Sequence, residues 1–589
     1  MGNAKWAGTP GGQSWNDASN WSGDVVPNTM ATFGASAATM VHFEDHSDAV
    51  IGAIEFDAEA PSYTFLIDAL AKIPALTIAG AGVKTASVCP QAFTVTSLGT
   101  YNQPQLKFIN SATAGDSQIS YYAGPPDLET SYGGGTIAFH DDATAGAARF
   151  TVRTGKQAPP NRSSTLGGQI TFSDQARAGV ATFSIFGTLG TDGDTFANVV
   201  FHDNASAERA VFTNHGGTVP GGDGGNSQFY DHSTAANGVY LNFGGSAKPV
   251  DGKGANGGDV AFDGLARGGN GQFNNYAASV QGSSGGVTSF NNNPNYPAMD
   301  AQGASADGGS YMNYGATAEF PGGGGHTEFT ARYGFSTAGT ATFYNFGSKI
   351  GNAGTAGHTS FSIGSPYASK GEPSDPANAF FPTACQATIW NLPGVAGGYT
   401  VFMVYNGVKQ NNQPTAGRAT IHNLGTEQAG EQGGYTVFQD TTTAGDARLT
   451  AQGGSFGGAG GQIIFCDQAT GGAAQVSLSG NGTLDLSGMT TGLALSTLSA
   501  QNGVIAVSLS TAHTALSLSG HLTLNGEILT FSLALPSGQS LDTDQSYPLM
   551  QAPNLDQFDT AQFSGNALDG VTPRFAIQGT TLYASFPPR

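Results

Sequence analysis

The chain has 589 residues, of which 88 are glycine and only 11% are charged. Glycine is about twice as frequent, and charge less than half as frequent, as the averages of about 7% and about 25% in globular proteins, which argues against a helical protein with an ordinary charged surface. The 42 acidic and 21 basic residues give a net charge of −21 without any basic stretch, so the composition disfavours nucleic acid as a partner.

Residues 1–95 hold Trp6, Trp15 and Trp21 together with several short strand-like segments. The Met-Gly-Asn start lacks the hydrophobic region of a secretion signal, and no stretch of the chain reaches about 18 consecutive apolar residues. We therefore expect no signal peptide and no membrane-spanning segment in this sequence. We interpret residues 1–95 as an N-terminal cap and first coils, because the open end of a repeat fold must be covered.

Residues 96–476 contain a recurring pattern: an aromatic residue, any residue, Asp or Asn, three residues, Ala-Gly, three residues and a second large apolar residue. Clear or weaker copies begin at Phe108, Phe139, Phe172, Phe201, Phe229, Phe262, Phe438 and Phe465. The steps are 31, 33, 29, 28 and 33 residues along the first six copies and 27 between the last two. Such a period is typical of stacked supersecondary units and is shorter than the roughly 40–50 residues of a propeller blade.

Within each copy the apolar residues alternate with polar ones, as in Ile170 and Phe172 before the Ala-Gly pair and Ala181 and Phe183 after it. Alternation with period two predicts half-buried β-strands. The Asp-x-x-Thr-Ala-Gly segment between them is turn chemistry, since Asp bonds nearby backbone and glycine adopts a positive φ. Each copy is thus a strand, a tight turn and a strand, and a less regular third side completes the coil.

Such a unit cannot bury its apolar face alone, but copies stacked about 4.8 Å apart share one interior. The pattern therefore predicts an all-β fold, a β-solenoid in which equivalent side chains form ladders. The expected aromatic ladder and the small residues opposite it are Phe139, Phe172, Phe201 and Phe229, and Ala148, Ala181 and Ala210. An array of β-sandwiches also has evenly spaced short strands and is the competing fold.

Gly- and Asn-rich stretches interrupt the repeat region, and we expect them to be loops on the third side of the coil. They are residues 215–226, 244–258 and 291–310, with the longest interruption at about 362–388. From residue 477 the pattern changes to alternating serine and leucine, as in Leu516-Ser-Leu518. We interpret residues 477–589 as C-terminal β coils and a cap.

The segment Trp15-Asn-Asp-Ala-Ser-Asn-Trp21 resembles the start of bacterial secreted proteins with autotransporter-associated β-strand repeats. The repeated Phe-x-Asp-x-x-Thr-Ala-Gly-x-Ala unit is similar to their coils, and residues 526–531 with Tyr547-Pro-Leu549 resemble their C-terminal segment. The resemblance implies a single-stranded right-handed parallel β-helix with terminal capping segments, exported to the cell surface or the medium. The shared motifs are structural and imply no activity.

The Asp or Asn at the third position of the repeat is the best candidate for a metal site, because stacked carboxylates can hold Ca²⁺ between coils. The interpretation we favour is a ladder of Asx turns, which requires no ion and tolerates Asn. The column consists of Asn110, Asp141, Asp174, Asp203, Asp231, Asn292, Asp440 and Asp467. We therefore expect no cofactor, with Ca²⁺ as the alternative.

Histidines and cysteines are the remaining residue types that could bind metal. The histidines one or three places after the first aromatic are interpreted as solvated ladder residues, because a metal site needs several to converge. These are His140, His202, His232 and His422. The three cysteines lie far apart without a CxxC motif and are interpreted as small buried hydrophobic residues. They are Cys89, Cys385 and Cys466.

An enzyme on this fold, such as a polysaccharide lyase or glycoside hydrolase, would need carboxylates about 5–10 Å apart in a groove. Two groups of neighbouring charged residues are candidates, although neither forms a motif: Asp259, Asp263 and Arg267, and Glu319, Glu328 and Arg332. We expect no catalysis, because charged neighbours arise by chance and no sequence signature of another reaction is present.

Tyrosines gather in the irregular segments, where they could stack on sugar rings or pack loops onto the coils; we favour packing. They are Tyr121, Tyr122, Tyr276, Tyr296, Tyr311, Tyr314 and Tyr367. Together these features predict a non-catalytic extracellular β-solenoid of a bacterial surface that presents loops for binding glycans, cells or copies of itself. The alternatives are a filament subunit that assembles through exposed strand edges and the polysaccharide-degrading enzyme.

Overall fold

The computed structural model describes residues 2–8, 12–43, 48–68, 75–97, 104–124, 133–156, 165–189, 195, 197–290, 303–331, 335–351, 353–363, 381–405 and 413–587. The chain divides into an N-terminal unit, Met1–Ser289, and a C-terminal unit, Phe290–Arg589. Regular structure in the described residues is almost entirely β-strand. Short 3-10 turns are η1 (Ala18–Asn20), η2 (Ala353–Thr355), η4 (Leu555–Gln557) and η5 (Thr560–Gln562).

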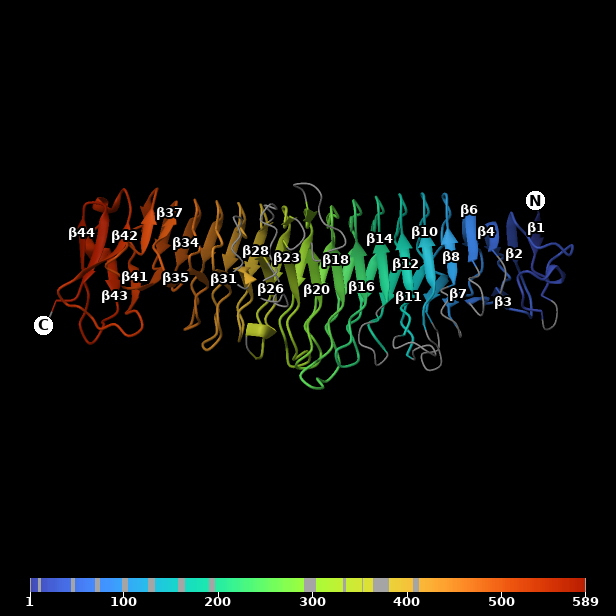
Figure 1. Cartoon of the computed structure of the whole chain (residues 1–589), viewed down its shortest axis with the longest axis horizontal. Coiled ribbons are helices and arrows are strands. Elements are labelled where there is room, and N and C mark those ends of the chain that lie inside the picture. The colour runs from blue at the N-terminus through green and yellow to red at the C-terminus, as the bar shows by residue number, and fades with distance from the viewer. Residues whose placement is uncertain are drawn as a thin grey trace. The chain divides into compact units, whose positions relative to one another are not determined.

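In the N-terminal unit, strands from successive coils pair in parallel into two sheets (Figure 1). The first sheet consists, in pairing order, of β1 (Asn3–Lys5), β2 (Met30–Phe33), β4 (Asp48–Phe56), β6 (Ala75–Thr85), β8 (Gln105–Phe108), β10 (Thr136–Phe139), β12 (Gln169–Phe172), β14 (Asn198–Phe201), β16 (Asn226–Phe229) and β18 (Asp259–Phe262). The second consists of β3 (Met40–Phe43), β5 (Thr64–Asp68), β7 (Gln91–Thr96), β9 (Ile119–Ala123), β11 (Arg149–Val152), β13 (Thr182–Ile185), β15 (Val211–Asn214), β17 (Val239–Asn242) and β19 (Gln272–Asn275). Strand β20 (Val287–Phe290) crosses the division between the units.

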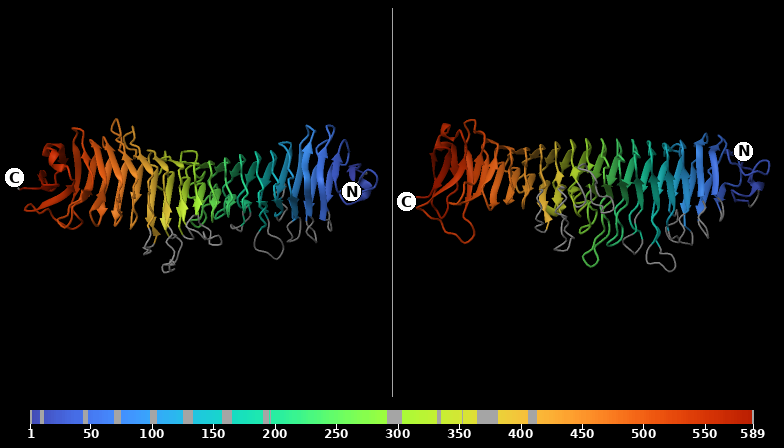
Figure 2. Two further views of the ribbon diagram at one scale, coloured as in Figure 1. Left: turned by 90° about the horizontal axis from the view of Figure 1, so that it is seen from above. Right: turned by 45° about the horizontal axis from the view of Figure 1, so that its top comes forward.

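The C-terminal unit repeats this arrangement, as the two further views in Figure 2 also show. Its first sheet consists of β23 (His326–Thr330), β26 (His358–Ile363), β29 (Tyr399–Val404), β31 (Tyr435–Phe438), β33 (Gln462–Asp467), β35 (Thr483–Met489), β38 (Val504–Ser508), β41 (Leu529–Ala534) and β43 (Phe563–Gly565). Its second consists of β22 (Ser310–Asn313), β25 (Thr342–Asn345), β28 (Thr388–Asn391), β30 (Thr420–Asn423), β32 (Arg448–Ala451), β34 (Gln475–Ser479), β37 (Thr497–Gln501) and β40 (Leu522–Thr523). A short third stack contains β21 (Ala304–Ser305), β24 (Ser336–Thr337) and β27 (Pro382–Thr383).

The register confirms that one sequence period is one coil. Phe139, Phe172 and Phe201 occupy the same position on β10, β12 and β14, and all are completely buried. Their rings stack in parallel with centroids 4.7 Å apart at both steps. The ladder continues to Phe229 at 4.6 Å, and Ala148 is buried as expected. The predicted all-β parallel β-solenoid is therefore confirmed, because equivalent residues share one interior within the unit.

The Asp-x-x-Thr-Ala-Gly segment is more ordered than a tight turn. It forms a further stack of single parallel bridges, such as Thr144 to Arg177 and Arg177 to Ser206. Gly179 in this stack has φ of +66°, and a Cβ there would lie 2.4 Å from the carbonyl oxygen of Gly146 in the preceding coil. Glycine is required because the coils approach too closely for a side chain. The irregular return, predicted at residues 215–226 and 244–258, lies between the second sheet and the first. The same prediction for 291–310 and 362–388 is wrong, because their described parts contain β21 and β27 and connect the first sheet to the second.

The first coil is covered by the three tryptophans of the N-terminal segment. Trp6, Trp15 and Trp21 are at most 2% exposed, and the Trp15 ring stacks on Phe43 at 4.9 Å. The indole N–H of Trp21 donates to the carbonyl of Trp15 at 2.7 Å. This polar contact lets the ring be buried without loss of a hydrogen bond.

The last coils end in a different sheet, in which parallel pairing gives way to antiparallel pairing. It consists, in pairing order, of β36 (Leu493–Leu495), β39 (Leu516–Leu518), β42 (Ser546–Gln551), β45 (Thr581–Ser585) and β44 (Arg574–Gln578). Strand β45 is antiparallel to both neighbours, β42 and β44. The change of direction stops the parallel stack. The domain boundaries near residues 95 and 476 stay predictions.

The interior of both units contains a column of asparagines at the end of second-sheet strands, which we call the asparagine seam. It consists of Asn214, Asn242 and Asn275 in the N-terminal unit and Asn313, Asn345, Asn391 and Asn423 in the C-terminal unit, all completely buried. Within each unit, every amide of the seam before the last donates to the amide oxygen of the next, for example Asn345 Nδ2 to Asn391 Oδ1 at 2.8 Å. A hydroxyl of the first sheet also donates to six of the seven amide oxygens, from a serine at Asn214 and from threonines at the others, as Thr359 Oγ1 does to Asn345 Oδ1 at 2.9 Å. The repeat pattern had predicted only apolar side chains inside the coils.

Candidate functional site

The Asp and Asn column bonds between coils rather than within its turns. The Asp174 carboxylate accepts the backbone N–H of Asp141 at 3.0 Å, and Asp203 accepts that of Asp174 at 3.0 Å. Asn110 fits the column because its Nδ2 donates to Ala79 O. Asp440 repeats the pattern with Asp467, whereas Asn292 lies outside the described residues. The bonding therefore differs from the Asx turns that we expected.

The backbone explains why Asp and Asn are used in this column. Asp141, Asp174 and Asp203 have φ of +56°, +60° and +53°. Asp and Asn tolerate this left-handed region better than other non-glycine residues. One carboxylate oxygen of each of these aspartates thus accepts a backbone N–H of the neighbouring coil. In the described part of the chain, no three His, Cys, Asp or Glu side chains form a group suited to a metal ion.

The four histidines do not converge. His140 and His202 lie 3.8 and 3.6 Å from carboxylates of the Asp column, Asp174 and Asp231. His422 lies on β30 of the C-terminal unit, where its ring stacks on Trp390 at 4.0 Å. His232 is exposed in the turn after the Asp column.

All three cysteines are free and partly exposed, so the expectation that they are buried is wrong. Cys385 shows the reason, since it occupies the turn position held by Gly417 and Gly445 in the next coils and has φ of +51°. Its N–H donates to Thr383 Oγ1 at 3.0 Å, as in those coils. A residue at this turn faces outward and cannot enter the core.

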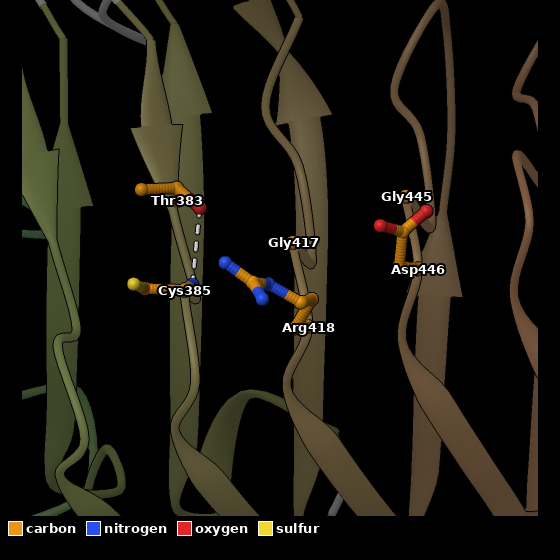
Figure 3. Close-up of a pocket in the computed structure, with 6 residues that line it drawn as sticks. All are labelled: Thr383, Cys385, Gly417, Arg418, Gly445 and Asp446. Atoms are coloured by element: carbon orange, nitrogen blue, oxygen red, sulfur yellow. Dashed lines mark hydrogen bonds between the residues drawn. The ribbon is translucent and has the colours of Figure 1, made fainter.

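Cys385 contributes to an open pocket of about 260 Å³ in the C-terminal unit (Figure 3). The pocket exists because Gly417 and Gly445 leave space between the side chains around them. The Arg418 guanidinium extends toward the Cys385 coil, and the Asp446 carboxylate lies on the other side. Arg418 and Asp446 are both exposed, so the pocket is a shallow polar depression without a buried reactive group.

The carboxylates considered for catalysis do not form a pair. Asp259 begins β18 and Asp263 follows its end, so about 13 Å of extended strand at about 3.3 Å per residue separates their backbones. Asp263 is buried at 2% exposure whereas Asp259 is partly exposed, so the two carboxylates do not face one open groove as those of a glycosidase do. In the other group, Glu328 lies on β23 and Glu319 on an exposed loop, and Arg332 is outside the described residues.

Two of the seven tyrosines, Tyr121 and Tyr311, are buried within the coils. Tyr121 is buried between Phe93 and Phe150, with both ring centroids 5.0 Å away, and its hydroxyl donates to Ala114 O. Tyr311 is likewise buried and stacks on Phe343 at 4.7 Å. Tyr122, Tyr276 and Tyr314 are partly exposed, whereas Tyr296 and Tyr367 lie outside the described residues. Tyr121 and Tyr311 lie on β9 and β22 rather than in irregular segments, so they belong to the core of the coils and do not pack loops onto it.

The outer face of β25, β28 and β30 carries aromatic side chains, of which the sequence pattern drew attention only to His422. The register places equivalent side chains side by side in three columns that we call the aromatic face: Thr342, Thr388 and Thr420; Tyr344, Trp390 and His422; and Phe346, Leu392 and Leu424. All nine residues are partly exposed. Their spacing in sequence varies from 32 to 46 residues because insertions differ between coils, which hides the columns from a search at fixed period.

The aromatic face is uncharged. It contains no Asp, Glu, Lys or Arg, and burial lowers the pKa of His422 below its usual value, so this ring is neutral at pH 7. Among the described residues, the indole N–H of Trp390 and the hydroxyls of Thr388 and Thr420 make no hydrogen bond with the protein. The face therefore combines apolar rings with polar groups that are available to a bound molecule.

No known protein family matches this chain, and a search of curated proteins finds no similar sequence. None of the helical segments in the described part of the chain has the length and hydropathy of a membrane span.

Proposed function

We propose that this protein is a non-catalytic, extracellular β-solenoid of a bacterial surface that acts as a rigid support and binds other surfaces. The observation that carries the proposal is the aromatic face, because exposed aromatic groups with unused polar groups are typical of recognition surfaces. The resemblance to bacterial proteins with autotransporter-associated β-strand repeats supports the location. The protein would thus bind through the flat side of its coils as well as through loops.

The many bonds between coils support the role of a rigid body. The aspartate column and the asparagine seam each bond from one coil to the next, as in the contact between Asn391 Nδ2 and Asn423 Oδ1 at 2.8 Å. In a stacked repeat, stability is a sum of contacts between neighbours. Side chains that bond across successive interfaces therefore hold the outer face of those coils in a fixed geometry within a unit.

The proposal can be tested by sedimentation of the purified chain with isolated bacterial cell envelopes. We expect the wild-type chain to sediment with the envelopes and the Trp390→Ala variant to remain mostly in the supernatant. Phe456→Ala is the matched control, because Phe456 is an aromatic residue of the same unit that is 88% exposed on a loop. Failure of the wild-type chain to sediment would contradict the proposal.

A filament subunit is a second candidate, and strand β44 favours it. Among the described residues β44 pairs with β45 alone, and its side chains are exposed or partly exposed along its whole length. An unpaired strand edge can pair with another chain. Negative-stain micrographs at low and high protein concentration separate the two candidates, since fibres at high concentration would support the filament and single particles would support the adhesive protein.

The polysaccharide-degrading enzyme is tested in parallel by release of reducing sugar ends or unsaturated products. We expect no release from polysaccharides that the chain binds. Release that disappears in Asp259→Asn or Glu328→Gln would overturn the non-catalytic assignment.

A further inference from the structure

The outer rings of the two units differ in how much ring surface they leave free. In the N-terminal unit, Phe186, His215, Phe243 and Tyr276 form a continuous stack with centroids 4.3, 6.1 and 4.9 Å apart. Both faces of the inner rings are therefore covered by neighbouring rings, and mainly edges face the solvent.

In the C-terminal unit the equivalent column, one residue after the seam position, contains Tyr314 and Phe346, which stack at 5.0 Å. The rings Tyr344, Trp390 and His422 form a different column, one residue before the seam position, and this column is interrupted. Trp390 stacks on His422 at 4.0 Å, whereas the ring of Tyr344 lies near Phe346 at 6.5 Å. Among the described residues, no ring contact joins Tyr344 to Trp390. The side of the Trp390 indole toward Tyr344 thus makes no ring contact among the described residues, although the two residues are in register on adjacent strands and both are partly exposed.

Polar groups flank this free ring surface on one side. The hydroxyls of Thr342, Thr388 and Thr420 form a column two residues before the rings, and among the described residues they have no hydrogen-bond partner in the protein. A sugar ring presents apolar C–H groups, which can pack on an indole, and hydroxyls, which can bond to threonine. Ligand sites generally combine apolar and aromatic contacts with a few placed polar groups.

Charge and dimensions restrict the ligand further. The face contains no acidic or basic side chain except the neutral His422, and the whole chain carries −21, so a polyanion would be repelled and would find no cation in the face. A second copy of this acidic chain is disfavoured for the same reason. The columns cross three coils, about 10 Å in all at about 4.8 Å per strand, so a chain of several sugars contacts more of the face than a single sugar does.

We propose that the aromatic face binds an uncharged polysaccharide chain, with the free side of the Trp390 indole as its central contact. This inference rests on the proposed adhesive function and names the class of ligand. It assigns binding to residues on the outer side of β25, β28 and β30 instead of to residues in the loops.

The test is electrophoresis of the full chain in native gels that contain one polysaccharide each. The neutral probes are laminarin, mannan and hydroxyethylcellulose, and alginate is the anionic comparison. We expect at least one neutral probe to retard the wild-type chain and alginate to have no effect. Trp390→Ala should weaken the affinity about tenfold, since central aromatic residues dominate such contacts.

Two further variants separate loss of binding from loss of structure. Trp390→Phe keeps a ring and should retain most of the affinity, whereas Phe456→Ala should bind as the wild type does. Equal mobility of all variants in gels without polysaccharide shows that they are folded alike. Retardation lost equally in Trp390→Ala and Phe456→Ala would overturn the assignment to the aromatic face.

Other outcomes are also decisive. A wild-type chain that none of the neutral probes retards, or that only alginate retards, overturns the inference. If that chain still sediments with cell envelopes through Trp390, the adhesive function stands and the ligand is another molecule, such as a protein. If it neither sediments nor is retarded, both the inference and the proposed function fail.

Discussion

Some coils have asparagine at the seam position and others have an apolar residue there. The two kinds of coil have the same backbone arrangement but different interiors. On β11 and β13 the seam position holds Val152 and Ile185, both buried, and on β15 the same position holds Asn214. In the C-terminal unit the change runs the other way, from Asn423 on β30 to Ala451 on β32. A β-solenoid therefore accepts either an apolar column or a hydrogen-bonded column at the same position, provided that neighbouring coils carry the same kind of residue there.

The ends of the seam show why neighbouring coils need the same kind of residue at this position. At its start, Asn214 Oδ1 is satisfied by the hydroxyl of Ser227 at 3.0 Å. At its end, Asn423 Nδ2 is buried and has no partner among the described residues, because the next coil presents Ala451. A head-to-tail ladder of amides always leaves one donor at its end. The structure tolerates this cost once per ladder rather than at every coil.

The largest effect is expected when the seam is broken in its middle. Asn345→Val removes the acceptor of Asn313 Nδ2 and Thr359 Oγ1 and the donor to Tyr399 O. We expect a loss of about 3–5 kcal/mol in local stability, since each buried group left without a partner costs about 1–3 kcal/mol. Hydrogen exchange of amides in β25 and β28 measures it. Unchanged protection would show that valine substitutes freely and that the two interiors are not distinct.

The reverse substitution tests whether an amide needs a neighbouring amide. Val152→Asn places a single amide between Ala123 and Ile185, and we expect a cost of about 2–4 kcal/mol. Ile185→Asn is the matched variant, because its new Nδ2 can donate to Asn214 Oδ1 in the next coil. Its cost should be smaller by about 1 kcal/mol, the value of one hydrogen bond. Equal exchange rates in the two variants would contradict the role of the neighbouring amide.

Lowering the pH should destabilise the C-terminal unit more than the N-terminal unit. In the C-terminal unit His326 and His358 stack with centroids 4.8 Å apart, followed by Tyr399 at 4.7 Å, with Glu328 beside His326. Burial, and then the neighbouring His326, lowers the pKa of His358 from 6.5 to about 3. The equivalent position of β12 holds Gln169, which does not titrate.

Because the pKa of His358 is lower in the folded chain, the unfolded chain binds more protons between pH 6.5 and about 3. Stability of the C-terminal unit should be constant above pH 6.5 and fall as the pH decreases below it. Hydrogen exchange at pH 7 and pH 4.5, corrected for intrinsic rates, should show opening of β23 and β26 but not of β12 and β14. His358→Gln should reduce this difference, and equal sensitivity of both units would contradict it.

The smallest effect is expected at the end of the seam. The double variant Asn423→Ala, Thr436→Val gives this coil the kind of interior that Ala451 and Ile463 provide in the next one. It also removes the Asn423 donor that has no partner among the described residues, and it makes Asn391 the new end of the ladder, where Nδ2 keeps Tyr435 O as an acceptor. We expect a change within about 1 kcal/mol, because a polar pair replaced by apolar groups is nearly neutral. A loss as large as that of Asn345→Val would show that position in the ladder is irrelevant.

The repeat pattern predicted the solenoid and its aromatic ladder because both depend on residues that recur at one interval. Phe139, Phe172 and Phe201 are recognisable without coordinates, since their alternation with polar neighbours encodes a strand with one buried face. The tryptophans at the start were likewise predicted to cover the coils. The cysteine prediction failed because Cys385 replaces a turn glycine, and residue type alone does not reveal which side of a turn faces the core.

The sequence by itself determined that the chain forms stacked coils with a phenylalanine interior, because local alternation and turn chemistry recur in every copy. Only the tertiary structure decided which distant side chains became neighbours. Asn345 meets Asn391 across 46 residues and Trp390 lies in register with Tyr344, and insertions of unequal length set these distances in sequence. Register between coils is established by backbone pairing over the whole stack, so the polar seam and the aromatic face emerge only when the coils are assembled.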